Sequence, residues 1–168
     1  MVHTLAAVLP LKQHPPTAER RIILVDIENV IGGAALTRDT ARWARRQLES
    51  VLMINVNDQV VIGASHVGFL NSALSWPNKQ YVVNSGVDGA DLALIDELEA
   101  LRVDRYDEVV VVSGDGIFAG PIAKLIAQGV SVTVVAHRGH CARRLHLAAT
   151  RTLYLQPGHD HYSCGGAA

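Results

Sequence analysis

Residues 108–113 read EVVVVS, and the three residues that follow are Gly114, Asp115 and Gly116. Four consecutive valines between polar residues are typical of a short strand that is buried on both faces. Strands of that kind belong to sheets that are covered by helices on both sides. The segment therefore predicts an α/β fold with an acid directly after one of its strands.

Similar runs recur along the chain and alternate with segments of helical periodicity. Thr37 is placed to cap one of these helices, and Gly129 to end another. Strands that alternate with helices are joined by right-handed crossovers and form a mostly parallel, doubly wound sheet. The predicted strands are 21–26 (RIILVD), 59–63, 80–84, 108–113, 131–136 and 152–155, and the predicted helices are 37–53, 66–76, 90–101, 116–128 and 140–149.

The length and composition fit one domain with an aliphatic interior. The chain has 168 residues, of which 49% are hydrophobic and only 5% aromatic, so Val, Leu, Ile and Ala must build the core. We assign residues 21–155 to this domain, residues 1–20 to a flexible N-terminal tail and residues 156–168 to a flexible C-terminal tail. The net charge of −1 gives no general affinity for polyanions, so contact with nucleic acid depends on local basic clusters.

The sequence indicates a cytoplasmic protein with no membrane partner. Two cysteines, Cys141 and Cys164, are too few for a disulfide framework. The apolar run 5–9 is too short to span a membrane, is broken by Pro10 and lacks the basic start of a signal peptide. The sequence leaves open whether the chain forms a homo-oligomer.

Three acids fall where parallel sheets bind ligands, beyond the carboxyl ends of the strands. Asp26 ends the first predicted strand, Asp91 opens the helix after the third, and Asp115 follows the fourth. Carboxylates that converge at one edge repel each other unless a cation lies between them, and their hard oxygens suit Mg²⁺ or Mn²⁺. Each acid also has a purely structural interpretation, as a helix cap, a first-turn charge or a turn residue. Asp88, in the turn 86–89, is a weaker candidate.

The motifs around these acids resemble those of the NYN domain, a member of the PIN-like superfamily. They are Asp-Ile-Glu-Asn at 26–29, Gly-Ala-Asp-Leu-Ala-Leu at 89–94 and Ser-Gly-Asp-Gly-Ile-Phe at 113–118. The resemblance implies a three-layer α/β/α sandwich and an endoribonuclease that cleaves single-stranded RNA with Mg²⁺ or Mn²⁺. It further implies that Asp26, Asp91 and Asp115 are the catalytic, metal-binding acids, and that Asn29 is an accessory residue of the site. The amide of Asn29 is expected to bind substrate by holding a phosphate oxygen, or only to form an Asx turn.

The chain departs from the family pattern at Ile117, where the family often has a further acid. The loss weakens the expectation of a second metal, which Asp88 would have to help hold. This departure supports an alternative interpretation, in which the chain is a non-catalytic PIN-like module that binds RNA or protein through a degenerate acidic site. A phosphatase-like or receiver-like domain also has an acid after its first strand, but the other residues of those patterns are missing.

Candidate contacts with the RNA are polar and basic. Ser113 precedes the third acid and is expected either to contact a phosphate or only to end its strand. Arg42, from a basic cluster on the first predicted helix, and Arg138, from a second cluster near the C-terminal end, are the arginines predicted to bind RNA. Arginines at such places bind RNA backbone in some proteins and are simply solvated in most. The other members of the two clusters are Arg45, Arg46, Arg143, Arg144 and Arg151.

Overall fold

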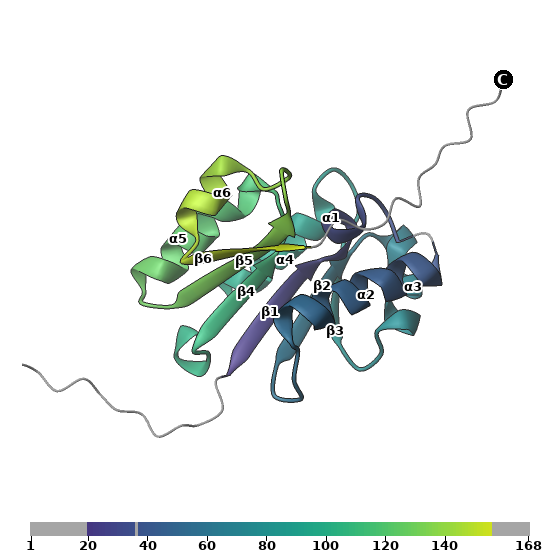
Figure 1. Ribbon diagram of the computed structural model, residues 1–168, viewed down its shortest axis with the longest axis horizontal. Helices are drawn as coiled ribbons and strands as arrows, with labels where there is room; N and C mark the ends of the chain where they lie inside the picture. Colours follow the sequence, from purple (N-terminus) through teal and green to yellow (C-terminus); the bar gives the residue numbers. More distant parts are fainter. Residues whose placement is uncertain (1–19, 36, 156–168) are drawn as a thin grey trace, which may run out of the picture.

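The computed structural model describes residues 20–35 and 37–155, so the predicted tails lie outside it except for Arg20. Six strands form one parallel sheet in the order β3-β2-β1-β4-β5-β6 (Figure 1). This sheet confirms the predicted α/β class. The strands are β1 Arg21–Asp26, β2 Gln59–Ala64, β3 Gln80–Val83, β4 Glu108–Val112, β5 Ser131–His137 and β6 Arg151–Leu155.

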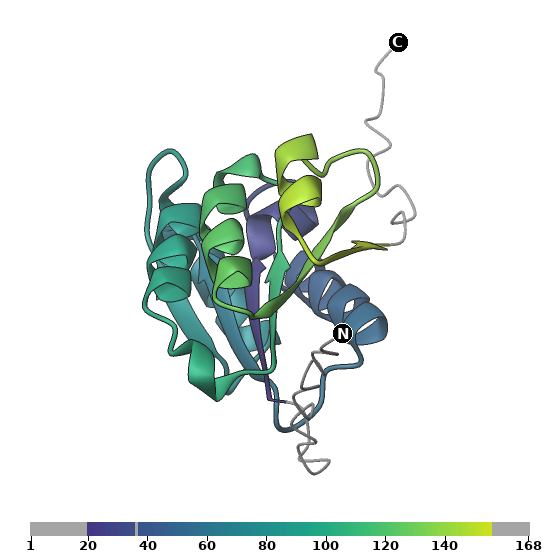
Figure 2. The same ribbon diagram turned by 90° about the vertical axis from the view of Figure 1, so that its left-hand side faces the viewer.

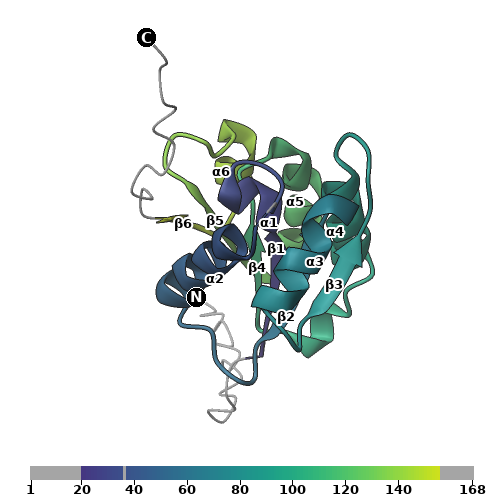
Figure 3. The same cartoon turned by 90° about the vertical axis from the view of Figure 1, so that its right-hand side faces the viewer.

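Helices cover both faces of the sheet and complete a three-layer α/β/α sandwich (Figure 2). On one face, α2 and α3 lie side by side and α1 adjoins α2 (Figure 3); α4, α5 and α6 pack on the other. No helix in the described part of the chain is long and apolar enough to cross a membrane. The helices are α1 Ile27–Ile31, α2 Arg38–Leu52, α3 His66–Ser75, α4 Gly89–Glu99, α5 Ala119–Ala127 and α6 Arg143–Ala148, with 3₁₀ turns η1 Val103–Arg105 and η2 Gly116–Phe118.

The central position of β1 explains why residues 22–25 of this strand are all apolar. It pairs with β2 on one side and β4 on the other, so Ile23 lies beside Val60 and Val110. Successive side chains of a strand point to opposite faces. Ile23 accordingly joins the core under α1 and α2, whereas Leu24 joins the core under α4 and α5, and both are fully buried.

Three local features differ from the sequence prediction. The short helix α1 follows β1 without a loop, and no helix was predicted there. The segment predicted as one helix over 116–128 begins with η2 and continues as α5. The helix predicted over 140–149 is confined to α6, because residues 138–142 form a turn that packs against the loop after β4.

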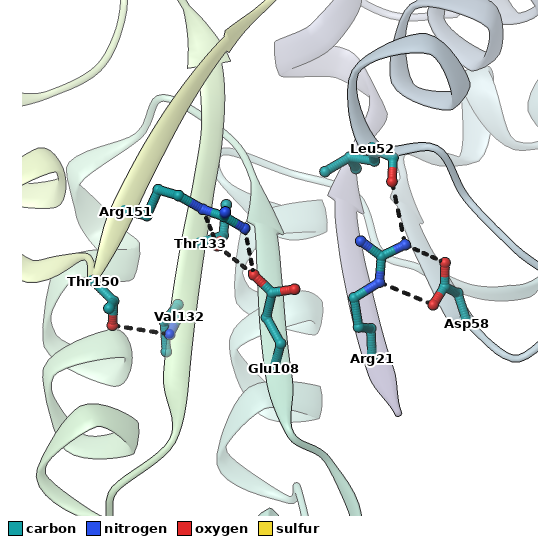
Figure 4. A network of polar contacts seen from close by, with 8 residues as sticks. All are labelled: Arg21, Leu52, Asp58, Glu108, Val132, Thr133, Thr150 and Arg151. Atoms are coloured by element: carbon teal, nitrogen blue, oxygen red, sulfur yellow. Dashed lines mark hydrogen bonds and ion pairs between the residues drawn. The ribbon is translucent and has the colours of Figure 1, made fainter. Parts of the chain in front are cut away.

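Polar side chains hold the amino ends of the strands together (Figure 4). Arg21 donates to both carboxylate oxygens of Asp58, at 3.0 and 2.6 Å, and to the carbonyl of Leu52. Burial alone would raise the pKa of Asp58, but the hydrogen bonds from Arg21 and from the Asn55 N–H outweigh it and lower that pKa. On the neighbouring strands, Thr133 and Arg151 both donate to Glu108.

Candidate metal centre and adjoining basic cleft

The predicted acids lie where the strand order reverses. The chain places β2 and β3 on one side of β1 and then crosses to place β4, β5 and β6 on the other. The carboxyl ends of β1 and β4 therefore form the topological switch point, where open α/β sheets bind their ligands. Asp26 ends β1 at this point, and residues 113–115 leave β4 beside it.

Asp26 is buried and its carboxylate is held by two donors. The backbone N–H of Asn29 donates to Oδ1 at 3.0 Å, which makes Asp26 the N-cap of α1, and the hydroxyl of Ser113 donates to Oδ2 at 3.1 Å. Only 5% of Asp26 is exposed. Burial raises the pKa of Asp26, while these hydrogen bonds act in the opposite direction.

Asn29, in α1, and Ser113, at the end of β4, hold the loop after β4 against the end of β1. The Gly114 N–H donates to the side-chain oxygen of Asn29 at 2.9 Å, and the Asp115 N–H donates to the hydroxyl of Ser113 at 3.1 Å. The Ser113 hydroxyl is only 1% exposed and already has a partner on each side. In this structure both residues order the loop after β4, and their predicted contacts with substrate stay predictions.

Asp91 lies in the first turn of α4 and faces Asp26 across the edge of the sheet. The helix approaches closely because Gly63, the partner of Asp26 on β2, has no side chain; a Cβ there would lie 2.6 Å from Leu94 Cδ1. Leu94 is one turn beyond Asp91, so its packing on Gly63 brings Asp91 close to Asp26.

The environment of Asp91 disfavours its charged form. Its Oδ1 atom is buried and has no hydrogen-bond partner among the described residues. Burial, the charge of Asp26 and the contact with Asp26, with smaller effects of Asp115 and Asp88, raise the pKa of Asp91 to about 8. A carboxylate pair of this kind is expected to attract a cation strongly.

The other two predicted acids, Asp115 and Asp88, lie near the pair of Asp26 and Asp91, but their side chains are directed at it less closely. Asp115 is exposed, and its Oδ1 accepts the Ile117 N–H at 2.8 Å, which caps η2. Asp88 precedes α4 in a left-handed conformation with φ of 58° and makes no cap hydrogen bond through its side chain. Within the described residues, no three His, Cys, Asp or Glu side chains are close enough to hold a metal ion by themselves.

A cavity of about 250 Å³ opens over the carboxylate pair and is strongly acidic. Glu28 also lines it, and this acid was not among the predicted site residues. Its Oε1 accepts hydrogen bonds from the backbone N–H and the hydroxyl of Ser65, so it joins α1 to the start of α3. Its position two residues after Asp26 was the available signal, but without the helix α1 its direction was not predictable. The acidic side chains of this cavity are Asp26, Glu28, Asp88 and Asp91.

A larger and basic cleft of about 670 Å³ adjoins the acidic cavity. Asn29 lines both, and Asp115 lies on the wall of the basic cleft. His140, Arg143 and Arg144 supply the other polar side chains. The carboxyl edge of the sheet is thus divided into an acidic part and a basic part.

The two arginines predicted to bind substrate lie outside both hollows. Arg42, on α2, pairs with Asp39 at 3.4 Å. Arg138, just after β5, stacks its guanidinium 5.1 Å from the centre of the Tyr154 ring. Their roles toward RNA stay predictions. The arginines that line the basic cleft are Arg143 and Arg144.

The acidic cavity suits a hard divalent cation. Mg²⁺ and Mn²⁺ prefer carboxylate oxygens, and Mg²⁺ is commonly bound through one or two carboxylates together with substrate phosphates and water. Asp26 and Asp91 supply two such carboxylates, and Asp91 Oδ1 is a buried acceptor without a partner among the described residues. The donor set therefore fits the implied metal.

Comparison with known proteins agrees with this arrangement. Residues 68–156, just over half of the chain, match the NYN domain, and the match includes Asp91 and Asp115. No curated protein matches the chain. Among solved structures, a protein of unknown function from Vibrio parahaemolyticus has a similar fold, with a TM-score of 0.58 and 19% identity over 86% of this chain and 97% of that chain. The chain therefore belongs to the NYN domain family and carries a nuclease-type domain of the PIN-like kind.

Proposed function

We propose that the protein is a metal-dependent endoribonuclease that hydrolyses phosphodiester bonds of single-stranded RNA in the cytoplasm. The observation that carries the proposal is the pair formed by the buried Asp26 and the half-buried Asp91, whose carboxyl groups face each other at the topological switch point. Membership of the NYN family supports nuclease chemistry at this site. The family resemblance supports single-stranded RNA as the substrate.

The roles follow from the positions of the side chains. Asp26 and Asp91 would hold Mg²⁺ or Mn²⁺, with Asp115 and Asp88 adding negative charge nearby. Such a cation lowers the pKa of water and neutralises charge on phosphoryl oxygens. The Ser113 hydroxyl and the Asn29 N–H fix the orientation of Asp26, because each donates to one of its carboxylate oxygens.

Asn29 holds the loop after β4 at the boundary between the acidic cavity and the basic cleft, through its bond to the Gly114 N–H. This boundary is the natural place for a scissile phosphate, because carboxylates lie on one side and guanidinium groups on the other. No side-chain nucleophile is needed for hydrolysis of this kind.

The test is cleavage of a labelled single-stranded RNA with Mn²⁺, with and without a chelator. We expect the wild type to cleave only with metal, and Asp26→Asn and Asp91→Asn to lose cleavage by a factor of about 100 or more. Asp96→Asn is the matched control, because Asp96 is an exposed acid on the same helix as Asp91. Circular dichroism must show that all variants are folded. Equal cleavage by all four proteins would exclude the acidic pair as the catalytic site.

A non-catalytic binding module is the second candidate. Ile117 stands where the family often has an acid, and the carboxylate of Asp115 is used to cap η2. Both features reduce the number of carboxylates directed at a metal. RNA binding by the wild type, without cleavage under any metal condition, would favour this candidate.

A further inference from the structure

We infer that the cleft between η2 and α6 is the subsite that binds the sugar–phosphate backbone of the RNA, through Arg143 and Arg144. The inference rests on the proposed function and adds to it where the substrate lies. It also assigns the binding of RNA to one side of the acids only, the side of β4 and α6.

Charge separates the two hollows at the carboxyl edge. The acidic cavity has four carboxylates and no basic side chain in its lining. The basic cleft has two arginines and His140 against one carboxylate, Asp115. Ile117 adds to this bias, since an acid at that position would bring further negative charge to η2. Without a bound cation, a polyanion is therefore repelled from the acidic cavity and attracted to the basic cleft.

Arg144 lies beside η2 and Asp115 because Gly116 has no side chain there. Its guanidinium lies over Gly116, where a Cβ would be 2.8 Å from Arg144 Cζ and nearer still to Nε. Any larger residue at 116 would displace the guanidinium. Gly116 therefore creates the space that lets a cationic side chain from α6 lie next to η2 and Asp115.

Arg143 and Arg144 line the cleft and have no partner in the described part of the chain, whereas Arg46, which also has none there, lies on α2 outside both hollows. Neither makes an ion pair or a side-chain hydrogen bond there, and both are exposed. By contrast, Arg42 pairs with Asp39, Arg151 pairs with Glu108 at the opposite edge of the sheet, and Arg138 stacks on an aromatic ring. Guanidinium groups without a partner are free to donate to phosphate oxygens in bidentate fashion.

The position of the cleft indicates a chain of phosphates and not a single anion. The cleft adjoins the acidic cavity through Asn29, so a ligand that reaches both must present one phosphate to the carboxylate pair and a neighbouring one to the arginines. The backbone of a single-stranded nucleic acid supplies such neighbouring phosphates, whereas a single anion does not. Its binding in the cleft needs no divalent metal, because the arginines supply the positive charge.

The first experiment measures binding of a short fluorescein-labelled oligouridylate by anisotropy in the presence of a chelator. We expect Arg143→Gln combined with Arg144→Gln to weaken binding about tenfold or more and to reduce the slope of log K against log salt by about 1.4, as for the loss of two phosphate contacts to a single strand. Arg105→Gln is the control, because Arg105 is an exposed arginine in η1, just before the amino end of β4. Equal loss in the control and the double variant, or no loss in either, would overturn the inference.

A second experiment moves the arginine without removing its charge. Gly116→Ala is expected to displace the Arg144 guanidinium and weaken binding of the same RNA, by about threefold to tenfold. Gly120→Ala is the matched control, since a Cβ at that position in α5 has no neighbour within 4 Å. Thermal melts must show that Gly116→Ala is folded. Unchanged affinity of a folded Gly116→Ala protein would exclude the proposed position of Arg144.

The outcome is distinguishable from that of the nuclease test. Binding that depends on the two arginines, together with an absence of cleavage, would support this subsite and remove the proposed catalysis. Metal-dependent cleavage that is unaffected in KM by the double arginine variant would support the nuclease and overturn the subsite. Failure of the wild type to bind RNA, or selective binding of a protein partner in its place, would also overturn the subsite.

Discussion

The carboxyl groups of Asp26 and Asp91 make the folding stability of the metal-free protein depend on pH. Burial and the neighbouring charge raise the pKa of Asp91 to about 8 from 3.8. The folded state therefore binds a proton more tightly than the unfolded state does, and the stability from this group is fully present below pH of about 4 and is lost as the pH rises to about 8.

We therefore predict that the melting temperature with chelator falls between about pH 5 and about pH 8.5, and falls less in Asp91→Asn. The substitution removes the titrating group and offers an amide that can donate to Asp26. Asp96→Asn serves as control and should follow the wild type, because Asp96 is exposed. The measurement is differential scanning fluorimetry; parallel curves for all three proteins would contradict the prediction.

Ser113 is expected to contribute to stability through its two hydrogen bonds. Ser113→Ala removes the hydroxyl that donates to Asp26 and accepts from the Asp115 N–H. A buried carboxylate that loses a donor should cost about 1–2 kcal/mol in the free energy of unfolding. Urea denaturation measures this, with Ser50→Ala on the exposed side of α2 as a control that should cost nothing. Equal midpoints for the two variants would show that the hydroxyl has no structural role.

At the residue scale, the sequence predicted where the polar residues lie in the fold but not which groups their side chains contact. A polar residue after a buried apolar run marks the end of a strand, which correctly placed Asp26, Ser113 and Asp115 near the carboxyl edge. Whether a side chain points at a ligand, a neighbour or its own backbone depends on contacts between segments far apart in the chain. Ser113 proved to donate to Asp26, 87 residues away, which no local pattern indicates, whereas the cap that Asp115 forms was among the structural interpretations of the acids.

At the scale of elements, the loop after β4 and the turn before α6 touch through their backbones. The Ala142 N–H donates to the Gly114 carbonyl at 2.9 Å. A Cβ on Gly114 would lie 3.0 Å from the carbonyl carbon of His140 and nearer still to its oxygen. The contact involves backbone on both sides, so relief requires the whole turn to move.

Gly114→Ala is accordingly predicted to destabilise the protein by about 1–3 kcal/mol, as overpacking does. It should also weaken RNA binding, because the turn leads into the two arginines of α6. Gly120→Ala is again the matched control and should be neutral or stabilising by about 0.5–1 kcal/mol, since Gly120 is in the α5 helix. Chemical denaturation tests the prediction, and a wild-type midpoint for Gly114→Ala would refute it.

The elements with strong periodicity were predictable, whereas the short helix α1 was not. Six strands and most of five helices follow from apolar runs and caps, because each buries a long stripe of side chains. The helix α1 has only five residues, which is too short for a periodic pattern. Its signals were the cap by Asp26 and the left-handed Gly32 at its end, and both also suit an ordinary turn.

At the scale of the whole molecule, metal binding should stabilise the fold. A ligand that binds only the folded state at about 100 times its dissociation constant adds about 2.7 kcal/mol. For a domain of this size that corresponds to a rise of about 5–10 °C in melting temperature. We predict such a rise with Mn²⁺ at about pH 8 in the wild type and none in the double variant Asp26→Asn, Asp91→Asn. An equal rise in the double variant would locate the metal elsewhere.

The strand order also has a consequence for synthesis of the protein. Strand β1 is made first yet lies in the middle of the sheet, with Arg21 paired to Glu108 on β4. A nascent chain that has only β1, β2 and β3 therefore exposes an aliphatic edge of β1 until β4 leaves the ribosome. Open edges of this kind recruit other chains. A fragment truncated before Glu108 would keep that edge exposed permanently, and we expect it to scatter light as aggregates at concentrations where the full chain stays clear.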